Sequence, residues 1–317
     1  MAYSYYIIAF FLILPLNCHA GNMTNIFDIR DEDNKVKKYV AVVLFSLFLL
    51  YGIVSNVLIA IIFCSRKILY NRAFILITFQ LVICSFLNFI PQVTIVLPEM
   101  LKTKNSDENN TMWIHSIFAT IDTFSFISML HFAFLLAINR FVAINWKKFN
   151  GFFQSIKFHL LLACVWLSVL VISLLEFHYC IKTFNASNLQ WSINCTRKNP
   201  EIGAVFLKIR YIWTLVLPIA MFAVYVPIFY NMRRKRNCVS ELRKTNESEE
   251  KNTVRTRKYE RSMLIQAAIV CAAIEIQVIC YYFLPQLATK IAGEEAEIPV
   301  NIFLNCFVIF SYAVLPT

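Results

Sequence analysis

Two charged side chains, one acidic and one basic, lie within one long apolar stretch of the sequence, between residues 113 and 143. Asp122 and Arg140 are eighteen residues apart. This spacing is five turns of an α-helix, so the two charges share one face and lie about 27 Å apart along the axis. An ionisable group in an apolar helix is costly unless it pairs, reaches water or takes part in function. Asp122 is therefore expected to hydrogen-bond to a neighbouring group, face water or contact a ligand. Arg140 is expected to extend to the membrane interface, pair with another group or take part in function.

The helix face between these charges predicts a binding cavity with the Asp122 carboxylate on its wall. Ser125, Phe126 and Met129 fill that face, and we expect them to contact a ligand together with Asp122. Glu275 lies in the middle of another apolar stretch, where a carboxylate must pair, take up a proton or reach water. It is expected to face the interior, near Asn301 or Asn305. Two roles remain open for it, a contact with the ligand and a structural hydrogen bond.

The elements that must position these side chains are seven apolar stretches, each long enough to cross a bilayer core of about 30 Å. Because backbone groups in lipid must be satisfied internally, and the stretches are too long and continuous for barrel strands, each is expected to be a helix. The fold class is therefore an all-α seven-helix membrane bundle over 39–317. The predicted spans are 39–63, 73–97, 113–143, 158–179, 204–230, 262–287 and 298–317.

Composition agrees with a membrane protein, since 59% of residues are hydrophobic and 15% are charged, more apolar surface than one soluble core can bury. The net charge is +11, but 11 of the 30 Lys and Arg residues lie between residues 231 and 262. Cations clustered beside a span indicate a cytoplasmic loop and lipid contact better than nucleic-acid binding. We therefore expect 231–261 to be the third cytoplasmic loop of a multi-pass plasma-membrane protein.

The other loops give the same orientation, with an extracellular amino-terminal segment over 21–38. Cations cluster after the first, third and fifth spans, which places those loops in the cytoplasm. Residues 1–20 contain a short apolar run and are typical of a cleaved signal peptide, although an uncleaved extra helix is the alternative. Four N-glycosylation acceptors fall on the predicted outer side: Asn22, Asn109, Asn185 and Asn194.

Cysteine positions predict one disulfide. Outside the expected signal peptide, only Cys180 and Cys195 fall in an extracellular loop, where the compartment is oxidising. A bridge closing this loop would contribute about 3 kcal/mol through the unfolded state. The alternative is a pair of unpaired thiols.

Enzymatic chemistry has no support in the sequence. The five histidines are dispersed without metal-ligand spacing, and we find neither a glycine-rich phosphate loop nor a nucleophile elbow. We therefore expect no catalytic residues, no metal and no cofactor.

Several short motifs resemble the rhodopsin-like seven-helix G-protein-coupled receptors. Asn139-Arg140-Phe141 is similar to the Asp-Arg-Tyr motif of that family. The second loop, with Cys180, Trp191 and Cys195, most resembles nematode serpentine chemoreceptors of class x or class v. Further landmarks are Gly52 with Asn56 in the first span, Phe79-Gln80 in the second, Trp166 in the fourth and Pro218 in the fifth.

The resemblance implies a chemosensory receptor that binds a small extracellular ligand and activates a heterotrimeric G protein. Amine receptors of the family carry an Asp at the spacing of Asp122, which implies a cationic ligand. Asn139, Arg140 and Phe141 would then serve coupling, and Glu260 would pair with Arg140 in the inactive state. The sequence departs from the family where His115 replaces the usual cysteine and Leu315 replaces the usual Asn.

Two other classes remain open at the level of sequence, a ligand-gated channel and a transporter of the plasma membrane. A transporter commonly has internal repeats and broken helices, and the halves of this chain do not resemble each other. A seven-helix sensory channel would normally have its amino terminus inside the cell. The location of the amino terminus therefore discriminates these classes.

Overall fold

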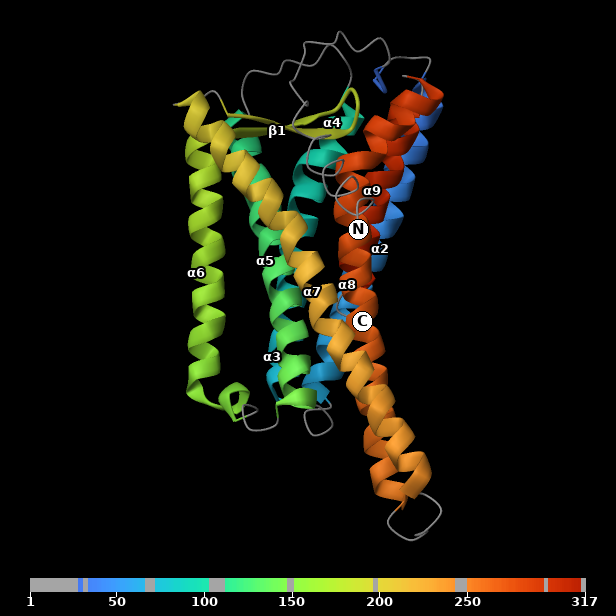
Figure 1. Cartoon of the computed structure of the whole chain (residues 1–317). Helices are drawn as coiled ribbons and strands as arrows, with labels where there is room; N and C mark the ends of the chain where they lie inside the picture. The colour runs from blue at the N-terminus through green and yellow to red at the C-terminus, as the bar shows by residue number, and fades with distance from the viewer. Residues whose placement is uncertain are drawn as a thin grey trace.

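The computed structural model describes residues 28–30, 34–65, 72–102, 112–146, 151–195, 199–242, 250–293 and 296–314. Within these residues the chain forms seven helical segments, the second of which is interrupted by a π-helical turn, η3 (Figure 1). They are α2 (Lys35–Ser65), α3 (Arg72–Pro91) with η3 (Gln92–Val96) and α4 (Leu97–Leu101), α5 (Met112–Asn145), α6 (Ile156–Tyr179), α7 (Pro200–Leu242), α8 (Glu250–Ala292) and α9 (Glu297–Val314).

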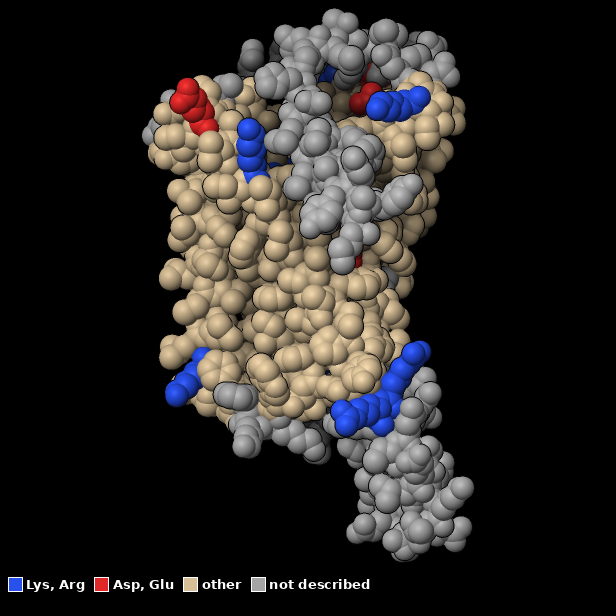
Figure 2. Space-filling model, viewed as in Figure 1, with Lys and Arg blue, Asp and Glu red and all other residues tan. Residues whose placement is uncertain are grey.

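The helical segments agree with the expected all-α membrane bundle. In the described part of the chain, six helices are long and apolar enough to cross a membrane, and Glu297–Ala313 forms a shorter apolar helix. Each predicted span falls within one helical segment, apart from 315–317, which lie outside the described residues. Figure 2 shows Lys, Arg, Asp and Glu side chains toward the two ends of the visible face, with a broad band of other residues between them.

The helices differ in how much of their surface the bundle covers. The most apolar window is 67% buried in α5 and 56% buried in the second segment, but only 22% buried in α2 and in α6. α3 and α5 therefore form the centre, whereas α2 and α6 present most of their apolar surface outward, as expected for helices that face lipid.

Close packing near the middle of α2 explains one of the family landmarks. A Cβ atom at Gly52 would lie only 2.6 Å from Cζ of Phe89 on α3, so a larger residue here would displace the Phe89 ring. Asn56 donates from Nδ2 to the carbonyl oxygens of Gly52 (2.8 Å) and Tyr312 (3.3 Å). These contacts join α2 to both α3 and α9.

The loop after α6 contains a β-hairpin that the all-helical prediction did not include. β1 (Ile181–Asn185) pairs antiparallel with β2 (Gln190–Asn194), with Phe184 opposite Trp191. The predicted Cys180–Cys195 disulfide is present and joins the two strands at the open end of the hairpin, opposite its turn. The hairpin lies across one end of the bundle, which we call the hairpin end (Figure 1).

At the opposite end, which we call the Arg140 end, α7 and α8 extend beyond the other helices (Figure 1). α7 continues to Leu242 and α8 begins at Glu250. Most of the expected loop over 231–261 therefore continues the two helices, as long polar extensions of otherwise apolar segments.

Candidate functional site

A cavity of about 100 Å³ lies at the hairpin end, bounded by the helices and the hairpin. Its wall includes Asn88 and Gln92 from the second helical segment, Asp122 from α5 and Trp191 from β2. α7, α8 and α9 complete the wall. The site thus depends on segments that are far apart in the sequence and are brought together only by the bundle.

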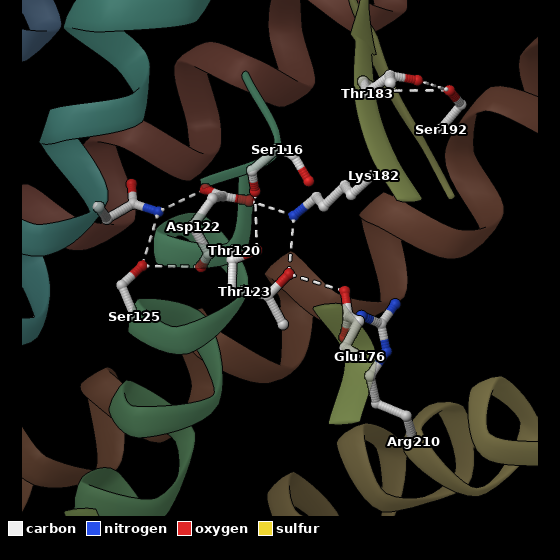
Figure 3. A network of polar contacts seen from close by, with 11 residues as sticks. Ser116, Thr120, Asp122, Thr123, Ser125, Glu176, Lys182, Thr183, Ser192 and Arg210 are labelled. Carbon is white, nitrogen blue, oxygen red and sulfur yellow. Dashed lines mark hydrogen bonds and ion pairs between the residues drawn. The ribbon is translucent and has the colours of Figure 1, made fainter. Parts of the chain in front are cut away.

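Asp122 is bound from two directions inside the protein (Figure 3). Lys182 from β1 donates from Nζ to Oδ2 of Asp122 at 2.5 Å, and Asn88 donates from Nδ2 to Oδ1 at 3.0 Å. The Lys182 and Asp122 side chains are 11% and 13% exposed. The carboxylate predicted to receive a ligand cation therefore already has a cationic partner from the hairpin.

The ammonium group of Lys182 has two further contacts. It donates to Oγ1 of Thr123 at 3.2 Å and lies 4.8 Å from the centre of the Trp191 ring. An ammonium over an aromatic face is attracted by the ring quadrupole. These contacts hold the lysine in place at the cavity wall, and they hold β1 against α5.

A second ion pair continues this polar chain (Figure 3). Arg210 of α7 donates from Nη1 to Oε2 of Glu176 near the end of α6, and Thr123 donates from Oγ1 to Oε1 of Glu176 at 3.0 Å. Thr123 therefore links the two ion pairs. Hydrogen bonds among charged groups that lie away from water can reinforce one another, so α5, α6, α7 and β1 are joined through one network.

Lys182, Glu176 and Arg210 belong to the site but were not predicted from the sequence. Glu176 and Arg210 both lie inside predicted spans, where ionisable groups are functional candidates and usually pair. That rule could have identified them. Nothing in the sequence indicates that Lys182, in a polar loop, reaches Asp122.

The predicted ligand-contact residues fall into two groups. Asp122 and Phe126 lie on the cavity wall. Ser125 is fully buried beside it and accepts a hydrogen bond from Asn88 at 3.3 Å. Met129 lies in the buried core, 1% exposed, and neither it nor the half-buried Glu275 belongs to the described lining of the cavity.

The two α9 amides that were expected near Glu275 contact the hairpin turn. Asn301 donates from Nδ2 to the carbonyl oxygen of Asn188, and Asn305 donates from Nδ2 to that of Leu189, both at 2.8 Å. Leu189 has a φ of 57°, a left-handed conformation that costs a residue other than glycine about 1 to 2 kcal/mol. Its side chain is buried and lines the cavity, so the turn is held in this conformation by the bundle.

The predicted coupling residues lie together at the Arg140 end of α5. Arg140 is buried, with Cζ of its guanidinium group 4.0 Å from the centre of the Phe74 ring on α3. Asn139 is buried beside it, and Phe141 packs edge-on against Trp146. Glu260 lies on α8, but its side chain is outside the part that the structure describes, so the Arg140 pair remains a prediction.

The predicted glycosylation sites remain predictions as well. Asn185 and Asn194 lie at the ends of the hairpin strands and are exposed, whereas Asn22 and Asn109 lie outside the described residues, as does the expected signal peptide over 1–20. Oδ1 of Asn185 accepts a hydrogen bond from the hydroxyl of Ser187 at 2.7 Å. Both acceptor side chains on the hairpin are therefore accessible to solvent.

The chain matches a known protein family. The family model described as serpentine type 7TM GPCR chemoreceptor Srx matches residues 43–309, a range that begins within α2 and ends within α9. The match includes the hairpin, the cavity residues apart from Tyr312, and the Asn139-Arg140-Phe141 motif. No curated protein matches the chain.

Proposed function

We propose a ligand site and a signalling partner for this chain, which belongs to the Srx family of serpentine seven-transmembrane chemoreceptors. The chain is a chemosensory receptor that binds a small extracellular molecule in the cavity at the hairpin end and activates a heterotrimeric G protein at the Arg140 end. The observation that carries this proposal is the cavity itself, because its wall combines five helical segments with the hairpin.

The orientation of the receptor follows from three features of the two ends. The hairpin end contains the Cys180–Cys195 disulfide, and disulfides persist in oxidising compartments. Exposed acceptor residues Asn185 and Asn194 lie at the same end. The cation-rich extensions of α7 and α8 lie at the Arg140 end, as expected for cytoplasmic segments. We infer a plasma-membrane receptor with an extracellular amino terminus.

The route from ligand to partner runs along the long helices. α8 contributes Gln277 and Tyr281 to the cavity wall, and the same helix begins at Glu250, at the far end of the bundle. A ligand that binds one orientation of α8 more tightly than another shifts the population toward that orientation. The change then alters the surroundings of Arg140, where the G protein binds.

The cavity is tested by filling it. Phe126→Trp enlarges a side chain on the cavity wall and should abolish ligand-stimulated GTP exchange in membranes that express the receptor. The matched control is Leu47→Trp, which makes a similar enlargement at an outward-facing position of α2 that is 59% exposed. Normal responses from a Phe126→Trp receptor with normal surface expression would exclude this cavity as the ligand site.

The orientation and the inactive-state pair are tested separately. An epitope inserted before Val36 should bind antibody on intact cells, and binding only after permeabilisation would contradict the extracellular amino terminus.

Glu260→Ala should raise basal GTP exchange, because it removes the proposed partner of Arg140. An unchanged basal rate would remove that pair from the mechanism.

A further inference from the structure

The polar groups of the cavity wall differ in how far the protein itself satisfies them. The charged groups Lys182 and Arg210 are engaged in ion pairs with Asp122 and Glu176. Four uncharged side chains on the same wall are not fully satisfied, the amides of Asn88, Gln92 and Gln277 and the hydroxyl of Tyr312. The amide oxygens of Asn88, Gln92 and Gln277 are buried without a hydrogen-bond partner among the described residues.

The three amide side chains are closed off from bulk water. Asn88, Gln92 and Gln277 are 1%, 2% and 4% exposed. A buried acceptor without a donor loses its hydrogen bond to water and gains nothing in return, so native proteins rarely retain one without a reason. Three such acceptors on the wall of one cavity indicate that the occupant of the cavity supplies the donors.

The orientation of the Asn88 amide is fixed by its neighbours. Its Nδ2 donates to Oδ1 of Asp122 at 3.0 Å and to Oγ of Ser125 at 3.3 Å. An ionised carboxylate only accepts hydrogen bonds, so the nitrogen must face Asp122 and the oxygen must be the free acceptor. Gln92 follows four residues later, at the first position of the π-helix η3.

The remaining wall favours an apolar body on the ligand. Phe126, Ile127 and Val308 contribute apolar surface, and Trp191 covers the site from the hairpin. A charged ligand, in contrast, would need to separate Lys182 from Asp122 or Arg210 from Glu176, in a place where water cannot replace the lost partner.

We propose that the ligand is an uncharged molecule that carries at least two hydroxyl or N–H donors, accepted by Asn88, Gln92 and Gln277, on an apolar body. This assignment rests on the proposed function of the cavity. It replaces the cationic ligand expected from Asp122, because Lys182 occupies the position of the ligand cation. Asp122 then holds the hairpin over the ligand and does not bind the ligand directly.

The first test uses variants that should weaken the response of the receptor to a ligand without lowering the thermal stability of the ligand-free receptor. Gln277→Met and Gln92→Met each remove an acceptor that has no partner, so the thermal stability of the ligand-free receptor should stay the same or rise. The apparent affinity for 1,2-hexanediol, an uncharged molecule with two hydroxyl donors, should weaken about tenfold for each variant. A fall in stability would show that the amides have a structural role and would overturn the proposal.

Ser173→Ala provides the matched control. The Ser173 hydroxyl on α6 is also buried without a hydrogen-bond partner among the described residues, but Ser173 does not belong to the described cavity wall. Its removal should leave the ligand response unchanged. An equal loss of response in Ser173→Ala would mean that the effect is general and not a property of the cavity.

The second test compares ligand charge directly. We would measure thermal stabilisation of the purified receptor by 1,2-hexanediol, hexanamide, hexylamine and hexanoate, which share a short apolar chain. The diol or the amide should stabilise the receptor, and Gln277→Met should reduce that stabilisation. Stabilisation by hexylamine or hexanoate alone, or by no compound, would overturn the ligand class.

The two proposals fail in different ways. If the amine or the carboxylate acts, and Phe126→Trp removes its effect, the cavity remains the ligand site and only the ligand class is wrong. If the diol or the amide acts equally on the Phe126→Trp receptor, the cavity is not the site and the proposed function fails with it.

Discussion

The two ends of the bundle satisfy their buried charges by different means. At the hairpin end, Asp122 and Glu176 meet Lys182 and Arg210 from separate elements, and the disulfide and the α9 amides fix the hairpin in addition. At the Arg140 end, the guanidinium group of Arg140 lies over the ring of Phe74.

This difference suggests different roles in a receptor. Several independent connections make the hairpin end rigid, which lowers the entropy cost of ligand binding. At the Arg140 end, Asn139 has a buried amide without a hydrogen-bond partner among the described residues. At both ends, amides without a partner inside the bundle can bind a group supplied from outside, a ligand at the hairpin end and a partner protein at the Arg140 end.

The largest effect should come from breaking the hairpin-end ion pair. Lys182→Met leaves the Asp122 carboxylate buried beside an apolar chain and should destabilise the receptor by about 3 to 5 kcal/mol. The double variant Asp122→Asn/Lys182→Met should regain most of this loss, since no lone charge remains. Thermal unfolding in detergent measures both, and additive losses would argue against the pair.

The disulfide should contribute slightly less. Cys180→Ser with Cys195→Ser removes a crosslink with a sequence separation of 15 residues, worth about 3 kcal/mol in the chain-entropy description. We expect a lower unfolding temperature and reduced surface expression. Cys164→Ser, at an exposed free cysteine on α6, is the control and should change neither quantity.

A smaller effect is expected at the Arg140 end. Phe74→Leu removes the ring beneath the guanidinium group and should cost about 1 to 2 kcal/mol from the cation–π contact, in addition to lost packing. Phe45→Leu, at a fully buried phenylalanine of α2, controls for packing. Basal GTP exchange should rise for Phe74→Leu alone, and equal basal rates would show that the contact does not restrain the receptor.

The smallest effect should come from single amides that hold the hairpin turn. Asn301→Ala removes the hydrogen bond to the carbonyl oxygen of Asn188, worth about 1 kcal/mol. Hydrogen exchange of the hairpin amides should accelerate about fivefold, while exchange near Arg140 stays unchanged. Acceleration at both ends would mean that the two ends are coupled more strongly than their separate contacts suggest.

The sequence by itself was sufficient for features that depend on position along the membrane normal. Long apolar stretches predict helices because the bilayer leaves the backbone no other partners, and the described residues of each predicted span lie within one helical segment. The Cys180–Cys195 disulfide was predictable because these two cysteines share one loop. The family was predictable from short motifs at known places in the spans, such as Asn139-Arg140-Phe141.

Only the tertiary structure decided which polar groups meet across the bundle. Lipid-facing and interior faces of a membrane helix are both apolar, so hydropathy indicates where a helix lies but not how it is rotated or which helices adjoin it. The hairpin was missed because its strands are short and their pairing depends on the covering bundle. For the same reason, only the assembled fold shows that Lys182 is the partner of Asp122. The unsatisfied oxygens of Gln92 and Gln277 likewise become visible only there.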